Sequence, residues 1–319
     1  MVLAQTTLIT GGGGFIGAHV AEELLRAGDH VRALDSLVPQ VHGDANRPDY
    51  LSDDVELIVG DVRDGDVVRK ALVGVDRVVH FAARVGVGQS MYEIAEYTSV
   101  NAVGTGVLLE ALLDSPVDRL VVASSMSVYG EGLYLDDEGT AVTALARRRE
   151  DLQNGQWEPR GPRGQALSNP YTGVLAIFAS RLLNDRPPLI FEDGEQRRDF
   201  VSVHDVARAC RLALTVRDAA GRVINVGSGQ SVSVNEIAQR LGKILGKEQI
   251  EPEVTGKYRV GDIRHCFADI SLANDVLNFT PKVDMDSGLT ELAEWLEGQV
   301  AVDSVDAATS ELASRGLTV

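Results

Sequence analysis

Cysteine is scarce in this sequence: Cys210 and Cys266 are the only two among 319 residues. They are too few for a disulfide framework and too far apart for the ligand spacing of a zinc site. Both stand in apolar stretches, so we expect two free thiols in a protein of the reducing cytoplasm. No grouping of histidine, aspartate and glutamate has metal-ligand spacing either, and we expect no bound metal.

Positive charge and long apolar runs are also in short supply. The chain has 30 Lys and Arg against 47 Asp and Glu, a net charge of −17. Broad nucleic-acid and anionic-membrane footprints need clustered positive charge, so we expect neither partner. No apolar run reaches the ~18 residues of a membrane span. The N-terminus lacks the basic start and cleavage site of a signal peptide.

The first half of the chain does contain an alternation of strands and helices. Apolar residues recur at helical spacing in several windows, separated by short apolar runs. The pattern predicts strands at 7–10, 31–34, 55–59, 77–81 and 119–124, and helices at 15–27, 67–72 and 95–113. Strands buried on both faces and alternating with helices pair in parallel. The predicted fold class is α/β, a doubly wound parallel (Rossmann) sheet with a smaller C-terminal domain.

The loop after the first predicted strand is rich in glycine. Gly11, Gly14 and Gly17 have the spacing in which one glycine makes a tight turn, one admits a pyrophosphate and one lets the helix pack against the strand. The next helix starts at Phe15 and Ile16, and its N-terminus offers free N–H groups and a positive dipole to phosphates. A flexible structural turn is the alternative reading.

Acidic and small residues follow the next predicted strands. Asp35 ends the second strand, eighteen residues after Gly17. A carboxylate there accepts hydrogen bonds from the adenosine ribose and repels a 2′-phosphate, which favours NAD over NADP. Asp61 and Val62 follow the third strand, where they can contact an adenine edge. These positions share one edge of the sheet, and together they predict a dinucleotide site.

Phe81, Ala82 and Ala83 follow the fourth strand, and the small side chains of the two alanines permit close approach to a dinucleotide. With Asn101 and the segment Ser124–Gly130, these motifs resemble the extended short-chain dehydrogenase/reductases. Within them the chain is similar to the nucleotide-sugar 4-epimerases, both the UDP-galactose 4-epimerase-like and the dTDP-rhamnose 4-epimerase-like groups. The resemblance extends to about Leu296.

The resemblance implies an NAD⁺ that is reduced and reoxidised within one catalytic cycle, while C4 of a UDP- or dTDP-hexose is inverted. It implies cofactor contacts for Asn101 and Ser124, and a hydrogen bond from Ser125 to the sugar 4-oxygen. Met126 and Ser127 stand where related 4,6-dehydratases have an Asp–Glu pair. Neither can shuttle protons as those carboxyls do, so dehydration is disfavoured. A homodimer is also implied.

The second half is expected to form the sugar-nucleotide pocket. The resemblance implies an aromatic role near the base for Phe191, and diphosphate contacts for Arg198 and Arg259. Guanidinium groups suit bidentate phosphate binding. Asn225–Gly229 is expected to be a returning strand and turn.

The two domains are expected to interleave along the chain. The predicted division is 1–165 with 199–229 for the NAD-binding domain, 166–198 with 230–296 for the substrate domain, and 297–319 for a tail. The segment Val203–Leu214 is expected to rejoin the NAD-binding domain, and a helix is expected at 233–245.

One departure from the family pattern is serious. The family base is a tyrosine with a lysine four residues later, whose charge lowers the pKa of the phenol. None of the seven tyrosines has a lysine at that distance. Glu131–Gln165 also holds no apolar run for the sixth strand that the sheet needs.

We therefore expect the chain to be interrupted within Gln156–Gln165, near Arg160–Gly161, by missing residues that carry the Tyr/Lys pair. If it is continuous, the alternative is a non-catalytic homologue that binds NAD and a nucleotide sugar. A decarboxylase or reductase of nucleotide sugars is a further alternative.

Overall fold

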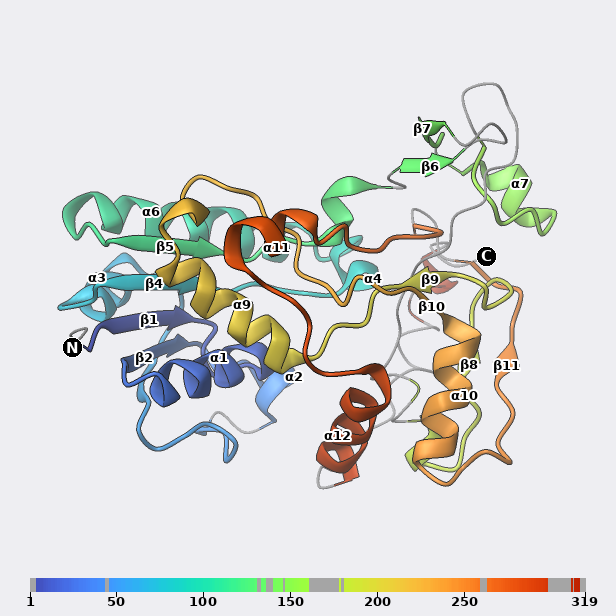
Figure 1. The fold of residues 1–319 in the computed structure, drawn as a ribbon, viewed down its shortest axis with the longest axis horizontal. Helices are drawn as coiled ribbons and strands as arrows, with labels where there is room; N and C mark the ends of the chain where they lie inside the picture. Colours follow the sequence, from blue (N-terminus) through green and yellow to red (C-terminus); the bar gives the residue numbers. More distant parts are fainter. Residues whose placement is uncertain are drawn as a thin grey trace. The chain divides into compact units, whose positions relative to one another are not determined.

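The computed structural model describes residues 4–43, 46–130, 133–135, 140–145, 147–160, 178, 181–258, 263–297, 311 and 313–315 (Figure 1). The chain divides into two compact units that alternate along the sequence. Unit 1 is Met1–Ser124, Val203–Ile224 and Leu272–Phe279, and unit 2 is Ser125–Ser202, Asn225–Ser271 and Thr280–Val319. Unit 1 therefore ends its first segment at Ser124, earlier than the predicted division at residue 165.

Unit 1 contains a parallel sheet of five strands among the described residues. The strands are β1 (Thr6–Thr10), β2 (His30–Asp35), β3 (Glu56–Val59), β4 (Arg77–His80) and β5 (Arg119–Val122). Their order is β3-β2-β1-β4-β5, and every pairing is parallel. The order reverses between β1 and β4, and such a switch point is where doubly wound sheets bind ligands. The predicted doubly wound sheet is confirmed.

Helices cover both faces of this sheet (Figure 1). They are α1 (Phe15–Arg26), α2 (Pro39–His42), α3 (Gly65–Leu72), α4 (Val87–Ser90), α5 (Ile94–Thr98), α6 (Gly104–Asp114) and α9 (Val203–Thr215). Successive strand side chains point to opposite faces, so Leu8 and Ile9 of β1 enter different cores. Ile9 packs with Val20 of α1 and Ala207 of α9, whereas Leu8 packs with residues of α3 and α6.

The helix predicted at 95–113 has a break in its hydrogen bonding. A five-residue π-helical segment, Ser99–Val103, separates α5 from α6. Such segments are rare and often mark functional sites. Asn101, a predicted site residue, lies in the middle of it.

Among the described residues, strand β5 forms one edge of the five-stranded sheet. All four residues of β4 are buried, whereas Val122 of β5 is 51% exposed. The strands that follow, β6 (Leu133–Leu135) and β7 (Ala141–Thr143), pair with each other in antiparallel fashion. The segment 131–165 thus contains two short strands, but they form a separate hairpin and supply no sixth strand to the parallel sheet among the described residues.

Unit 2 has short strands around a core of its own. The strands are β8 (Leu189–Ile190), β9 (Arg197–Arg198), β10 (Val232–Ser233) and β11 (Glu253–Val254). The longer helices are α10 (Val234–Ile244) and α12 (Met285–Glu297), and α7 (Arg149–Gln153) is short. Ser233 caps α10 by accepting a hydrogen bond from the Glu236 N–H, 3.1 Å away. The 3-10 turn Met126–Tyr129 also belongs to unit 2. The helix α11 (Ser271–Leu277), apart from its first residue, and the 3-10 turn Arg217–Ala219 belong to unit 1.

The strand expected at Asn225–Gly229 is not there. The carboxylate of Asp199 instead accepts hydrogen bonds from the N–H groups of Ser228 (2.6 Å) and Gly229 (2.9 Å). A side chain thus satisfies the backbone groups that a neighbouring strand would have paired, and the segment remains a turn. None of the described helices has both the length and the apolar character needed to cross a bilayer.

Candidate cofactor-binding site

The turn after β1 has room only for glycine at two key positions. Gly11 has a φ of +72°, and a Cβ there would lie 2.8 Å from the backbone nitrogen of Ala82. A Cβ on Gly17 would lie 2.4 Å from the carbonyl oxygen of Gly11. Both distances are far below van der Waals contact, so the turn, the start of α1 and the end of β4 approach one another closely only because these side chains are absent.

The N-terminus of α1 is equipped to bind an anion. Its N-cap is Gly14, which has no side chain to cap the helix, and the first turn carries no acidic residue. The first intrahelical bond runs from the Ala18 N–H to the Gly14 carbonyl. The preceding N–H groups have no acceptor within the helix, and the dipole is positive at this end. Phe15 and Ile16 are 39% and 43% exposed there, which leaves the helix start accessible.

Asp35 is held next to the glycine turn at the end of β2. Its Oδ2 accepts from the Gly13 N–H at 3.0 Å, and its Oδ1 accepts from the Leu37 N–H at 2.9 Å. The Nε2 atom of His42 lies 3.7 Å from Oδ1. The Tyr50 hydroxyl donates to the Gly13 carbonyl at 2.8 Å. Burial, and then the charge of Asp35, raise the pKa of Tyr50, which keeps this phenol protonated as a donor.

Asp61, after β3, is engaged by a residue that the sequence analysis did not single out. Arg63 donates from Nη2 to Oδ2 of Asp61 at 2.6 Å and from Nε to Oδ1 at 3.0 Å. Its Nη1 reaches Glu96 and Ser99, both at 3.2 Å. The hydrogen bond from Arg63 is the main cause that lowers the pKa of Asp61. Asp61 is therefore a fixed, ionised acceptor beside the buried Val62.

The end of β4 is held by side chains from β1 and from the π-helical segment. The Ala82 N–H donates to Thr10 Oγ1 at 3.2 Å. The Asn101 side chain accepts from the Arg84 N–H at 2.7 Å and donates to the Arg84 carbonyl at 3.0 Å. Both of these Asn101 bonds hold the loop after Phe81 and Ala82, and Ala83 in that loop is exposed. Unit 1 thus brings the predicted glycine, Asp35 and β4 positions to the C-terminal ends of neighbouring strands.

Ser125 opens the 3-10 turn Met126–Tyr129 by accepting from the Ser127 N–H at 3.2 Å. Ser124, Ser125 and Tyr129 are exposed, and the Tyr129 hydroxyl donates to Asn225 Oδ1 at 2.8 Å. This hydrogen bond engages the Tyr129 hydroxyl, and we assign Tyr129 no role as a base. Ser125 carries a hydroxyl at an accessible position, and its contact with the sugar 4-oxygen stays a prediction.

The remaining predicted substrate residues belong to unit 2. Phe191 directly follows β8. Arg198 is only 6% exposed, and its guanidinium donates to the carbonyl oxygens of Ile263 at 3.0 Å and Arg264 at 3.3 Å. Arg259 lies outside the described residues, as do residues 161–165 of the window Gln156–Gln165 in which the interruption of the chain is expected.

Arg264 is the centre of a buried ionic cluster in unit 2. It is 1% exposed and contacts three carboxylates: Glu158 at 2.8 Å, Glu192 at 3.0 Å and Asp193 at 2.8 Å. Burial opposes ionisation of Asp193, but the hydrogen bonds and charge of Arg264 outweigh it and lower the pKa of that carboxyl. The sequence analysis missed this cluster, because its members lie up to 106 positions apart.

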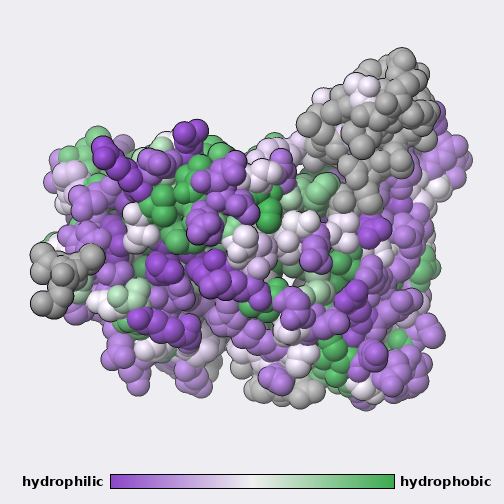
Figure 2. Space-filling view, in the orientation of Figure 1, coloured by the Kyte–Doolittle hydropathy of each residue, from purple (hydrophilic) through white to green (hydrophobic). Residues whose placement is uncertain are grey.

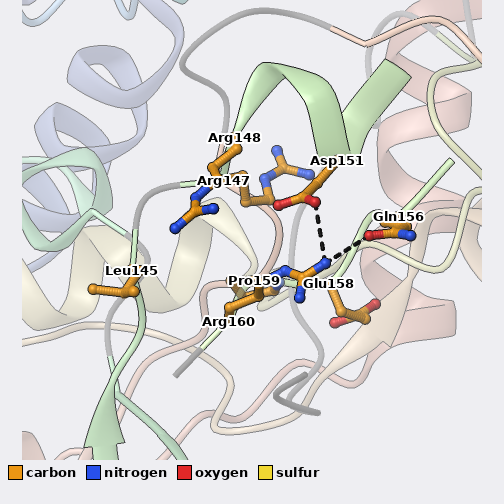
Figure 3. Close-up of a pocket in the computed structure, with 8 residues that line it drawn as sticks. All are labelled: Leu145, Arg147, Arg148, Asp151, Gln156, Glu158, Pro159 and Arg160. Carbon is orange, nitrogen blue, oxygen red and sulfur yellow. Dashed lines mark hydrogen bonds and ion pairs between the residues drawn. The ribbon is translucent and has the colours of Figure 1, made fainter. Parts of the chain in front are cut away.

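A cavity beside this cluster does not qualify as a sugar site. Arg147, Arg148, Asp151 and Glu158 are among the residues that line it (Figure 3). Its volume is about 30 Å³, the space of one water molecule. Arg160, also in its wall, is bonded to Asp151 at 3.1 Å and to Gln156 at 2.7 Å (Figure 3).

No cluster of metal-ligating side chains occurs in the part of the chain that the structure describes. Cys210 and Cys266 are free thiols, as expected. Burial raises the pKa of the Cys210 thiol to about 12, so it is not a nucleophile at neutral pH.

The glycine turn, the uncapped start of α1 and the fixed Asp35 fit a dinucleotide. The model of the NAD dependent epimerase/dehydratase family matches residues 7–151 and 158–227. The chain belongs to this family. Its predicted membership of the extended short-chain dehydrogenase/reductases is confirmed, and NAD is its cofactor.

Relatives cover nearly the whole chain. It is 32% identical to dTDP-L-rhamnose 4-epimerase of Burkholderia thailandensis, over 93% of this chain and 96% of that protein. It is similar to the crystal structure of UDP-glucose 4-epimerase from Thermotoga maritima with UDP-glucose, at 27% identity and a TM-score of 0.73, over 92% of this chain and 98% of that one. The NAD complex of Thermus thermophilus UDP-glucose 4-epimerase matches at 28% identity with a TM-score of 0.69, over 92% and 100%.

The alignment with the Burkholderia enzyme also contains gaps within this chain. The alignment runs over 352 positions, whereas 93% of 319 residues is about 297. About 55 aligned positions therefore hold no residue of this chain. The family model is itself interrupted between residues 151 and 158. A tyrosine–lysine pair is absent from a sequence that is internally shorter than this relative.

Proposed function

We propose that the protein is an NAD-dependent 4-epimerase of a nucleotide sugar, a UDP- or dTDP-hexose. The observation that carries the proposal is the cradle at the switch point of the sheet: a glycine turn with no space for a Cβ, an uncapped helix start and an anchored Asp35. Its relatives named as 4-epimerases span almost all of both chains.

The proposal gives each part of the chain a task. The N–H groups at the start of α1 hold the diphosphate, and Asp35 accepts from the adenosine ribose. Asp61 receives the adenine amino group, and Ser125 hydrogen-bonds the sugar 4-oxygen. Bound NAD⁺ supplies the hydride acceptor for transient oxidation at C4 and returns the hydride to the other face. In unit 2, Phe191, Arg198 and Arg259 are proposed to contact the sugar nucleotide.

A second candidate function is binding of NAD and a nucleotide sugar without turnover. It is favoured by the sequence itself, in which no lysine stands four residues after any tyrosine. Without that ammonium, no phenol of the chain has the partner that lowers its pKa toward neutrality in the family.

The decisive experiment incubates the purified protein and NAD⁺ with a panel of UDP- and dTDP-hexoses and follows inversion at C4 by NMR. An epimerase converts at least one sugar and releases no NADH. Net NADH release indicates that the sugar is oxidised without return of the hydride, which contradicts an epimerase. Binding by calorimetry without conversion of any sugar identifies the second candidate and overturns the first.

Two variants sharpen this experiment. Ser125→Ala is expected to lower kcat because it removes the donor to the 4-oxygen, and Ser127→Ala is the matched control. An intact mass above 34.2 kDa, the mass of the printed sequence, would show residues within the predicted gap.

We also propose a homodimer formed through α6. Leu109 and Leu113 stand four residues apart on α6 and are 47% and 83% exposed; Val103 of the π-helical segment is 54% exposed and Ile94 of α5 is 63% exposed. An apolar stripe of this kind marks a contact surface. Light scattering of the wild type is expected to give twice the chain mass, and Leu109→Glu a single chain mass. Val73→Glu, at an isolated site that is 69% exposed, is the control. A cytoplasmic location without nucleic-acid or membrane partners completes the proposal.

A further inference from the structure

A line of side chains, buried at Thr10 and His80 and half-buried at Thr105, connects β1, β4 and the start of α6. Thr10 Oγ1 lies 2.6 Å from Nδ1 of His80, and Nε2 of His80 lies 2.9 Å from Oγ1 of Thr105. Thr10 is fully buried and His80 is 4% exposed. Each hydroxyl has one further partner: Thr10 Oγ1 accepts from the Ala82 N–H at 3.2 Å, and Thr105 Oγ1 donates to the Asn101 carbonyl at 2.6 Å.

The partners at the two ends of this line determine which atom carries the proton in each hydrogen bond. A carbonyl oxygen only accepts, so the single hydroxyl proton of Thr105 goes to Asn101. Thr105 must therefore accept from His80, which places the proton of the neutral imidazole on Nε2. Nδ1 is then an acceptor, and it receives the hydroxyl proton of Thr10. Thr10 in turn accepts from Ala82. One tautomer of His80 satisfies all four bonds.

The neutral state of His80 agrees with its surroundings. Burial lowers the pKa of this imidazole below its usual value. A protonated ring would carry hydrogen on both nitrogens and would leave the buried Thr10 hydroxyl proton without this acceptor.

The ends of the line are the segments that form the cofactor cradle. Thr10 directly precedes Gly11, and Ala82 is the residue whose backbone a Gly11 Cβ would strike. At the other end, Asn101 holds the loop after β4 through both of its bonds to Arg84. The parallel ladder already ties β1 to β4, with Thr10 opposite His80. The side-chain line adds a connection from these two strands to the π-helical segment.

We propose that His80, in its Nε2–H form, is a positioning residue for NAD: through Thr10 and Thr105 it sets the glycine turn, the Ala82 backbone and the Asn101 segment in one mutual arrangement. It touches none of the reacting atoms. The inference rests on the proposed function for its ligand, but the tautomer is a property of the protein alone.

The test removes one hydroxyl at a time at nearly constant volume. Thr10→Val and Thr105→Val are expected to weaken NAD binding about three- to tenfold in calorimetry, as loss of a hydrogen bond in the line predicts. Thr7→Val is the matched control, because Thr7 is equally buried in the same strand and its hydroxyl has no hydrogen-bond partner. Thr105→Ser keeps the hydroxyl and is expected to restore wild-type affinity.

A spectroscopic measurement on the protein without NAD tests the tautomer. The nitrogen-15 spectrum of the His80 ring is expected to show hydrogen on Nε2 only, with slow exchange with solvent. Hydrogen on Nδ1, or equal affinity for NAD in Thr105→Val and the wild type, overturns the inference. A wild-type protein that binds no NAD refutes the proposed function instead, and the ring spectrum then still decides the tautomer.

Discussion

The amide nitrogen of Gly13 lies 3.0 Å from Oδ2 of Asp35. This bond joins the glycine turn after β1 to the end of β2, so the carboxylate that we propose selects the nucleotide also shapes the turn that we propose holds its phosphates. The second oxygen of Asp35 accepts from the Leu37 N–H, where the backbone has a positive φ of 47°. A carboxylate at this position orders both loops before any ligand arrives.

Replacement of Asp35 by Asn is expected to weaken NAD binding by about tenfold, because charge-assisted hydrogen bonds are worth about 1.5–3 kcal/mol. The variant also loses its repulsion of a 2′-phosphate, so the preference for NAD over NADP should narrow. Calorimetry with both nucleotides measures this. Asp53→Asn, at a fully exposed side chain, is the control. Equal weakening for both nucleotides would mean that the substitution only disorders the loops.

Gly17→Ala is expected to disrupt the cradle. Its Cβ would lie 2.4 Å from the Gly11 carbonyl oxygen and 2.7 Å from Gly12 Cα, and both obstacles are backbone. Overpacking of this kind costs about 1–3 kcal/mol, so urea unfolding should show a lower midpoint and NAD affinity should fall. Gly288→Ala in α12, where the nearest atom to the new Cβ lies 3.7 Å away, should leave both unchanged.

Arg264→Met is expected to destabilise the protein by about 3 kcal/mol, because it removes a buried cation shared by three carboxylates, although Glu192 keeps its ion pair with Arg147 at 2.7 Å. The arginine is 1% exposed in the wild type, and Glu192 is 4% exposed. Arg240→Met removes an arginine that also pairs with two carboxylates but is 38% exposed, and its cost should stay below about 1 kcal/mol. Urea unfolding of the two variants compares them, and similar losses would contradict the buried cluster.

Acid is expected to destabilise the fold through His80. Its folded-state pKa is lowered from 6.5 by burial, so between that lowered pKa and 6.5 the unfolded chain binds more protons. Stability therefore falls as the pH decreases below about 6.5. The free energy of unfolding, measured from pH 7.5 downward, should fall less steeply in His80→Gln. The pKa of His265 is lowered as well. The free energy of unfolding of the variant should therefore still fall with decreasing pH, but less steeply than that of the wild type. Identical slopes would exclude a contribution from His80.

The sequence predicted unit 1 well because its signals are local. The strand after which Gly11 turns, the helix from Phe15 and the acidic end of β2 at Asp35 each depend on neighbours within a few residues. The π-helical segment was missed, because its apolar spacing differs little from that of an α-helix over five residues.

The residues that the sequence could not indicate act over long separations. Arg264 meets Glu158 across 106 positions, and Thr105 meets His80 across 25. The segment Asn225–Gly229 was predicted as a returning strand and turn, and its strand is absent. Nothing in its own residues shows that the Asp199 carboxylate accepts from the N–H groups of Ser228 and Gly229. For Ser125, Phe191, Arg198 and Arg259, the proposed roles remain predictions.

Within the described residues no strand pairs with the outer side of β5, and for a chain without further internal residues this has a consequence for handling the protein. A strand whose backbone donors and acceptors face water is a template on which another polypeptide can extend the sheet. Val122, which is 51% exposed, adds an apolar side chain to that side of the strand. Recovery of monodisperse material after refolding should therefore depend on dilution, since self-assembly along this side of β5 competes with each molecule reaching its native state.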